Sequence, residues 1–181
     1  MSASAPAWPC DAVADGVIDP RAFRNAVGRF ATGVTIVTVR GIDGRPIGLT
    51  ANSFASVSLD PPLVLWSLAK KSANRDNFLR APGFAIHVLS RDHLWLAHRF
   101  ASAAGDRFDG LEFQAGHAGA PLLQHFSARL DCRMFDTVDA GDHDIFIGQV
   151  VAMKVVEETE RPLVFHRGEF VMLDAGDASP A

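Results

Sequence analysis

Tyrosine is absent from this chain of 181 residues, and cysteine occurs only at Cys10 and Cys132. No tyrosine chemistry is therefore available. Two cysteines do not form a disulfide framework, and we expect two unpaired thiols in a reducing cytoplasm. The chain also lacks any run of 18 or more apolar residues, and its start lacks the basic and apolar regions of a signal peptide. We therefore expect no membrane span and a cytoplasmic location.

An excess of positive charge is also missing. The formal net charge is −4 and the sequence pI is about 5.9, which argues against a nucleic-acid-binding protein. The motifs GxGxxG, GxxxxGK[ST], GxSxG and CxxC do not occur. Their absence argues against a Rossmann dinucleotide site, a P-loop and a serine-hydrolase elbow.

A possible metal cluster occurs at Asp142, His143 and Asp144. Neighbouring side chains of a strand point to opposite faces, so these three side chains cannot easily reach one ion. We expect no metal site.

What the chain does contain is enough apolar material, 48% of its residues, for the core of one domain. We expect a flexible leader at 1–18, one domain at 19–173 and a flexible tail at 174–181. Asp19 and Pro20 predict a helix start, with Phe23, Val27 and Phe30 on one apolar face and an end near 32–33.

Most of the remaining chain has the composition of β-strands, because β-branched and aromatic residues recur between turn signals. Short helices are expected at 74–80 and 92–101, the second with Leu94, Ala97, His98 and Ala101 along one side, and a long surface excursion at 103–120. The pattern predicts a mainly β fold, a closed antiparallel barrel with helices at its edges. The predicted strands cover residues 34–39, 46–50, 63–68, 84–90, 127–138, 145–156, 163–166 and 169–173.

The stretch GLTANSFASVSLDPP at 48–62 is unusual, because residues 50–56 are too polar and small for an ordinary buried strand. We interpret it as the floor of a cofactor site, where hydroxyls and an amide supply hydrogen bonds and small side chains let a flat ligand approach. The alternative is an edge strand whose polar residues face water.

A basic loop follows one strand later at 70–75, and it could hold a phosphate or be a solvated turn. The turn at 141–143 could place His143 over the same rim, or be a plain hairpin. Arg99 and Arg167 carry the same ambiguity between a phosphate or carboxylate contact and an ordinary surface position.

Several segments together resemble the flavin reductase domain family, the small reductase components of two-component flavin-dependent monooxygenases. The resemblance covers about residues 20–173. The segments that carry it are FATGVT at 30–35, GLTANSFASVSLDPPLVL at 48–65, residues 84–89, AHRFA at 97–101, GDH at 141–143, IG at 147–148 and PLVFHRG at 162–168.

This resemblance implies an FMN-binding type of split β-barrel, usually a homodimer, that reduces FMN or FAD with NADH or NADPH. Reduced flavin then goes to a partner monooxygenase. By matching position, the flavin ring and ribityl chain would lie along Thr50, Ala51, Asn52, Ser53, Ser56 and Val57. The ring edge or phosphate would lie near Ser67, Lys71, Ser72, Asn74 and Arg99. The nicotinamide nucleotide would lie near His143, His166, Arg167 and Gly168.

The chain departs from the family at two places. Phe165, His166 and Phe170 stand where tyrosines often occur, so stacking is retained and a phenol hydrogen bond is not. Ala73 stands where a threonine is often found, which weakens the phosphate assignment there.

Hydride transfer between two cofactors needs no protein nucleophile, so we expect no catalytic side chain. Three alternatives stay open: a flavin-binding electron carrier or sensor on the same barrel, an enzyme resembling pyridoxamine-phosphate oxidase, and a non-enzymatic barrel domain within a complex.

Overall fold

A computed structural model describes residues 13–14, 17–103, 105–156 and 161–173. Most of the expected leader, Cys10 and the whole expected tail lie outside these residues. The longest helices in the described part of the chain have eight residues, and none of its helices could cross a membrane.

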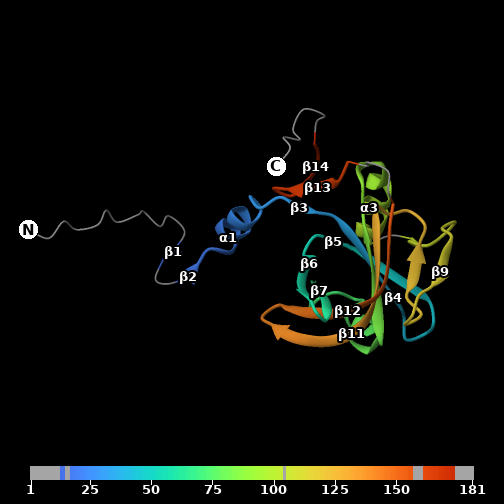
Figure 1. The fold of residues 1–181 in the computed structure, drawn as a ribbon. Coiled ribbons are helices and arrows are strands. Elements are labelled where there is room, and N and C mark those ends of the chain that lie inside the picture. The colour runs from blue at the N-terminus through green and yellow to red at the C-terminus, as the bar shows by residue number, and fades with distance from the viewer. Residues whose placement is uncertain (1–12, 15–16, 104, 157–160, 174–181) are drawn as a thin grey trace, which may run out of the picture.

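The main body is one antiparallel sheet of seven strands, which curls into the barrel seen in Figure 1. Its spatial order is β5-β4-β8-β11-β12-β7-β6. The mainly β fold with short helices is confirmed. In chain order the strands are β4 (Thr35–Arg40), β5 (Pro46–Ala51), β6 (Ala55–Leu59), β7 (Pro62–Ala69), β8 (Gly83–Val88), β11 (Ala128–Ala140) and β12 (His143–Val155).

The connection between β5 and β6 explains why the sheet curls. These strands form opposite edges of the sheet, yet only residues 52–54 join them. Seven flat strands would separate their edges by about 29 Å, because strands lie roughly 4.8 Å apart. The four steps from Ala51 to Ala55 reach at most about 14 Å. The polar stretch therefore bridges the two edges of a curled sheet.

Two apolar cores lie on either side of β4, whose residues 35–39 are all buried. Val37 and Val39 face the barrel interior, where Trp66 stacks on Phe146 with ring centroids 4.9 Å apart. Ile36 faces the second core, which lies beneath α3 (Leu94–Ala101). This burial on both faces is the reason for the continuous β-branched run in the sequence.

Helix α1 (Pro20–Val27) stands away from the barrel in Figure 1. The Asp19 side chain accepts a hydrogen bond from the Ala22 N–H at 2.7 Å, which confirms the predicted cap. The predicted end near 32–33 is wrong. Arg29 N and Phe30 N bond carbonyls three residues back and so close the helix in turns, which leaves Phe30 beyond it.

The apolar face predicted for α3 is only partly right, because Ala97 is buried and Leu94 packs against the second core, but His98 and Ala101 are exposed. Leu96, Ala97 and Phe100 are the buried residues, whereas His98 is exposed with its ring 4.9 Å from that of Phe170. Leu96 and Phe100 lie one turn apart, and their larger apolar area decides which face packs. A 3₁₀ turn, η1 (Arg91–His93), precedes α3, and α2 (Arg75–Arg80) follows β7.

Smaller sheets complete the fold. Strands β13 (Leu163–His166) and β14 (Glu169–Met172) pair with β3 (Thr32–Gly33), and β1 (Val13–Ala14) pairs with β2 (Val17–Ile18). Strands β9 (Phe113–Ala115) and β10 (Pro121–Leu123) form a hairpin. Strand β9 lies within the segment 103–120 that was expected to be a surface excursion, and β10 follows it directly. Phe108 of that segment is buried as well, so the expectation of a purely surface path is wrong.

Candidate functional site

The polar stretch is anchored where it leaves β5. Thr50 Oγ1 donates to the Ala97 carbonyl of α3 at 2.7 Å, and Thr35 Oγ1 donates to the Ala51 carbonyl at 2.8 Å. These bonds hold the end of β5 against its neighbours. Asn52 is exposed, and its amide donates to Thr32 Oγ1 at 3.3 Å.

Ser53 closes the barrel at this point. Its hydroxyl accepts from the Ser67 N–H at 2.9 Å and donates to the Ser67 carbonyl at 3.2 Å. One side chain thus replaces a backbone partner for β7 and joins two residues that were predicted to contact the flavin. Neighbouring Ser56 and Val57 of β6 are exposed, and an irregularity in pairing at 56–58 leaves Val57 without a strand partner.

The basic loop after β7 is mostly neutralised. Lys70 Nζ lies 2.7 Å from Asp139 Oδ1, and Arg75 binds the buried Asp144 carboxylate with two hydrogen bonds. The bond from Arg75 is the main reason why the pKa of Asp144 lies below its usual value. Lys71 is exposed and takes part in no salt bridge among the described residues. It is therefore the cation of this loop with a charge to offer an anion.

His143 lies beside this loop. It is the first residue of β12 and pairs with Ala69 at the end of β7, while the Lys70 N–H bonds the Asp142 carbonyl at 2.9 Å. The His143 Nδ1 lies 2.7 Å from the Asp142 carboxylate, and this bond lowers the Asp142 pKa. The structure thus brings His143 and the basic loop together at the end of the barrel where β7 ends and β12 begins. Ser72 belongs to the same loop, where its hydroxyl accepts from the Asn74 N–H at 3.3 Å.

Arg99 and the turn at 166–168 have other partners. The Arg99 guanidinium bonds the carbonyls of Asp106 and Asp109, so it holds the loop after α3. Arg167 has a positive φ of 53° in a two-residue turn with Gly168, and its N–H bonds the Gly28 carbonyl at 2.9 Å. His166 ends β13. No hydrogen bond among the described residues connects this turn with the loop at 70–75.

The fold also forms a cavity of about 650 Å³ beside Asn74, lined in addition by Asn77, Arg45 and Arg107. Sequence reasoning missed these three residues. A spacing of three places Asn74 and Asn77 one turn apart at α2, and this signal was available. Arg45 and Arg107 come from loops that are distant in sequence from Asn74, and no sequence pattern connects them with it.

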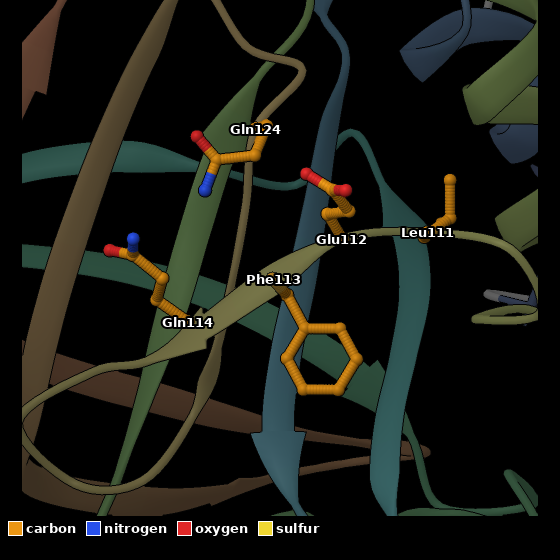
Figure 2. A pocket seen from close by; sticks show the side chains of 5 residues that line it. All are labelled: Leu111, Glu112, Phe113, Gln114 and Gln124. Carbon is orange, nitrogen blue, oxygen red and sulfur yellow. The ribbon is translucent and has the colours of Figure 1, made fainter.

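A second hollow of about 410 Å³ lies over the hairpin of β9 and β10 (Figure 2). In Figure 2 the polar ends of Glu112 and Gln124 lie on one side of the hairpin, and the Phe113 ring extends to the other side. None of the residues predicted to bind a cofactor lines this hollow. We therefore take the rim formed by residues 50–57, 67–74 and 143 as the candidate site.

A barrel whose edges are bridged by a polar, small-residue stretch, with an exposed lysine and a histidine at the same rim, suits a flavin-type oxidoreductase. The model of a protein family described as "flavin reductase like domain" matches residues 27–174 of this chain. The chain belongs to this family, which confirms the resemblance seen in the sequence.

Relatives agree with this assignment. The chain is 49% identical over 150 residues to the FMN reductase (NADH) SmoA of Agrobacterium fabrum, covering 83% of this chain and 84% of that protein. It is 38% identical over 170 residues to HsaB of Rhodococcus jostii, the reductase subunit of a flavin-dependent monooxygenase, covering 94% and 86%. The chain spans only 44% of the length of another relative, a Rhizobium meliloti protein of 49% identity.

Solved structures show the same fold. Nitrilotriacetate monooxygenase component B of Mycobacterium thermoresistibile superposes with a TM-score of 0.83 at 36% identity, covering 89% of this chain and 90% of that one. The NADH:FAD oxidoreductase SgcE6 of Streptomyces globisporus, in complex with NAD and FAD fragments, has a TM-score of 0.80 at 36% identity, covering 90% and 99%. The predicted split barrel and the predicted enzyme class, a flavin reductase, are confirmed.

Proposed function

We propose that this protein transfers a hydride from NADH or NADPH to FMN or FAD and supplies the reduced flavin to a separate monooxygenase component. The observation that carries the proposal is the bridge at Ser53 and Ser67. It fixes an accessible stretch of small residues between the two sheet edges, next to Lys71 and His143. The relatives named above as reductases and monooxygenase subunits support the same activity.

The residues at the rim fit a flavin. Small side chains at Ser53 and Ser56 admit a flat ring close to the backbone, and Asn52 offers an exposed amide, whereas Ala51 is buried in the barrel core, so only its backbone could lie near the ring. Lys71, with Ser72 and Asn74, would bind the phosphate. When bound, the flavin accepts the hydride and supplies the redox chemistry.

The chain's own residues act by binding and orientation. Backbone N–H groups near 51–53 would stabilise negative charge on the pyrimidine side of the ring. We propose that His143, His166, Arg167 and Gly168 seat the nicotinamide nucleotide on the open face, and that Ser67, Val57 and Arg99 border the flavin. The proposed hydride transfer requires no side chain as nucleophile or general base.

A direct test is NADH and NADPH oxidation by the purified protein, with and without added FMN, FAD and riboflavin. Turnover that requires added flavin supports the proposal. A tightly bound yellow chromophore without nucleotide oxidation would instead identify an electron carrier or sensor. Failure to bind any flavin would exclude the proposal.

The role of His143 has its own test, because its place in the turn at 141–143 suggests nucleotide binding rather than hydride transfer. We expect His143→Ala to raise the KM for NADH with little change in turnover number. Lowered turnover with unchanged KM would contradict this role.

We infer that two copies of the chain associate through α1. An eight-residue helix is marginal in water by itself, and none of its residues is buried. Phe23 and Val27 are 57% and 52% exposed, and Phe30 just beyond the helix is 77% exposed. A second copy covering these side chains would stabilise the helix. Sedimentation should give a dimer for the wild type and a monomer for Phe23→Asp combined with Val27→Asp.

The cytoplasmic location is part of the same proposal, because NADH, NADPH and free flavins are cytoplasmic metabolites. Cell fractionation tests it. A protein recovered outside the cytoplasmic fraction would contradict it.

A further inference from the structure

The hairpin of β9 and β10 is attached to the barrel by side chains rather than by backbone pairing. It forms a sheet of its own, and in the described part of the chain no backbone–backbone hydrogen bond joins residues 113–123 to the seven-stranded sheet. Four side chains of β4, β8 and β11 instead bond its backbone: Thr38 Oγ1 donates to the Pro121 carbonyl at 2.6 Å, Arg129 donates to the Leu123 carbonyl at 2.8 Å, His87 Nε2 accepts from the Leu123 N–H at 3.0 Å, and Asp131 Oδ2 accepts from the His117 N–H at 2.6 Å. The hairpin can therefore leave the barrel without breaking the pairing within either sheet.

Most of these anchoring side chains are covered from solvent. Thr38 and His87 are fully buried, Asp131 is 6% exposed, and Asp131 Oδ1 has no hydrogen-bond partner among the described residues. All three residues of β9, in contrast, are exposed. A buried polar group that loses its partner is costly, so the docking of the hairpin depends on intact bonds to its anchors.

His87 is the anchor whose bond a proton can reverse. Its Nδ1 lies 3.2 Å from the Ile36 carbonyl, which can only accept, so Nδ1 carries the hydrogen and Nε2 accepts from the Leu123 N–H. A second proton on Nε2 would set two donors against each other across 3.0 Å, whereas the bond to Ile36 would persist. Burial lowers the pKa of His87 to about 3, so above that pH the docked hairpin and the protonated ring exclude each other.

Other charged groups surround this contact. From β11, Arg129 and Asp131 face the hairpin, and the charge of Arg129 adds to the cost of a charged imidazole at His87. Arg40 at the end of β4 lies 3.3 Å from the place that a Cβ at Gly119 would take. The hairpin, its flanks and η1 contribute four further titratable groups, which are Glu112, His117, His125 and His93. Only two of the four anchors, His87 and Asp131, can change their charge in mild acid, and the experiment must separate them.

The hairpin also supports the strand that leads into the proposed flavin site. The Phe113 ring of β9 lies 5.5 Å from the buried Phe108 ring, and a Cβ at Gly48 of β5 would lie 3.2 Å from Phe108. Arg107, the residue before Phe108, donates to the Gly48 carbonyl at 2.7 Å. A hairpin that leaves the barrel therefore withdraws packing from β5 two residues before Thr50.

We propose that the hairpin of β9 and β10 is an acid-released flap: protonation of His87 frees it from the barrel, and its release loosens the polar stretch that holds the flavin. The second half of this inference rests on the proposed flavin reductase function, whereas the release itself does not. Bound flavin in turn holds the hairpin closed, because two coupled equilibria act on each other equally.

Amide hydrogen exchange of the full chain at pH 7 and pH 5 tests the release, with each rate compared with that of an unstructured peptide at the same pH. The N–H groups of Leu123 and His117 report docking, and that of Phe146 reports the barrel. Protection of Leu123 and His117 should fall about 25-fold between pH 7 and pH 5, the factor for a histidine whose pKa is 6.5 in the open state and about 3 in the docked state. No fall, or an equal fall at Phe146, would overturn the inference.

Three variants identify the group responsible. His87→Gln does not titrate in this range, so the fall in protection should disappear. Asp131→Asn keeps an oxygen for the His117 N–H, and His125→Gln removes an exposed histidine beside β10, so both should retain the fall. If His87→Gln does not dock at pH 7, the wild type and the other two variants still decide. A fall that disappears in Asp131→Asn would contradict the assignment to His87.

FMN tests the coupling to the rim. At about a hundred times its Kd, FMN should raise the protection of Leu123 and His117 up to about a hundredfold, because a ligand that binds only the closed state suppresses opening. Bound FMN that leaves these two amides unchanged would refute the coupling. Wild-type protein that binds no flavin would refute the proposed function instead, and the acid release would still be decided by the exchange at the two pH values.

Discussion

The barrel interior and its rim differ in the side chains that they contain: apolar rings are buried inside, and polar side chains are exposed at the rim. Inside, Trp66, Phe78, Phe84 and Phe146 are fully buried, and their rings meet at centroid distances from 4.9 to 6.1 Å. At the rim, Asn52, Ser56 and Lys71 are exposed. The interior therefore determines where the strands lie, and the rim presents groups that a ligand can bind. Substitutions in the two regions should affect different measurements.

Loss of an interior ring should have the largest effect. Phe146→Ala removes the stack on Trp66 and leaves a cavity, so the free energy of unfolding should fall by about 3–5 kcal/mol. Urea denaturation measures this, and the remaining folded protein should bind flavin normally. Val57→Ala at the rim is the control and should change stability by less than about 0.5 kcal/mol. Similar losses for both variants would remove the distinction between the regions.

Acid should destabilise the protein first through His87, which lies on the face of β8 towards the second apolar core, and only at lower pH through the pair of Arg75 and Asp144 near the rim. His87 is fully buried, with Nδ1 3.2 Å from the Ile36 carbonyl and Nε2 accepting from the Leu123 N–H. Burial lowers its pKa from 6.5 to about 3. Between these two pH values the unfolded chain therefore binds a proton at this histidine and the folded chain does not. The contribution of His87 to the free energy of unfolding is complete above about pH 6.5 and is lost as the pH drops towards 3.

Between pH 7 and 4.5 this histidine alone should cost the folded state about 2–3 kcal/mol. The loss involving Asp144 begins only as the pH falls into the usual carboxylate range, where the unfolded chain takes up the proton, and it continues below that range because the folded pKa is lowered. Urea denaturation across this pH range measures the slope. His87→Gln should flatten it, although the variant is less stable at pH 7. An unchanged slope would assign the pH dependence to other groups.

Ser53 lies on the boundary between the two regions, and its substitution should affect both measurements. Ser53→Ala removes both hydrogen bonds to Ser67. We expect a loss of about 1–2 kcal/mol in stability, together with weaker flavin binding. Ser56→Ala makes the same chemical change at an exposed position and should leave stability unchanged. Full stability in Ser53→Ala would mean that the barrel edges stay together without this bridge.

The comparison also explains which features the sequence could predict. The strands were predictable because β-branched runs such as residues 34–39 bury both faces. The end of α1 could not be predicted, because it depends on turns such as the one at Arg29. The packed face of α3 could not be predicted in full, because it depends on neighbours such as Phe170 that are distant in sequence. The small polar residues of the rim were visible in the sequence, and their role as a cofactor site stays a prediction. The pairing of Lys70 with Asp139 and of Arg75 with Asp144 could not be predicted, because each partner lies 69 positions away along the chain.

This pairing leads to the smallest and most specific effect, a difference between two adjacent lysines. Lys70 is bound to Asp139, whereas Lys71 takes part in no salt bridge among the described residues. Lys71→Ala should raise the KM for FMN about fivefold, or ~1 kcal/mol, because the exposed charge is screened by water. Riboflavin lacks the phosphate, so its KM should stay unchanged.

Lys70→Ala is the matched control and should change the KM for FMN less, since its charge is already neutralised. Both variants should keep wild-type stability, because exposed charges contribute little to folding. If Lys70→Ala weakens FMN as much as Lys71→Ala does, the pairing with Asp139 does not decide which lysine binds the phosphate. If riboflavin weakens as well, Lys71 acts on the ring or on the loop rather than on the phosphate.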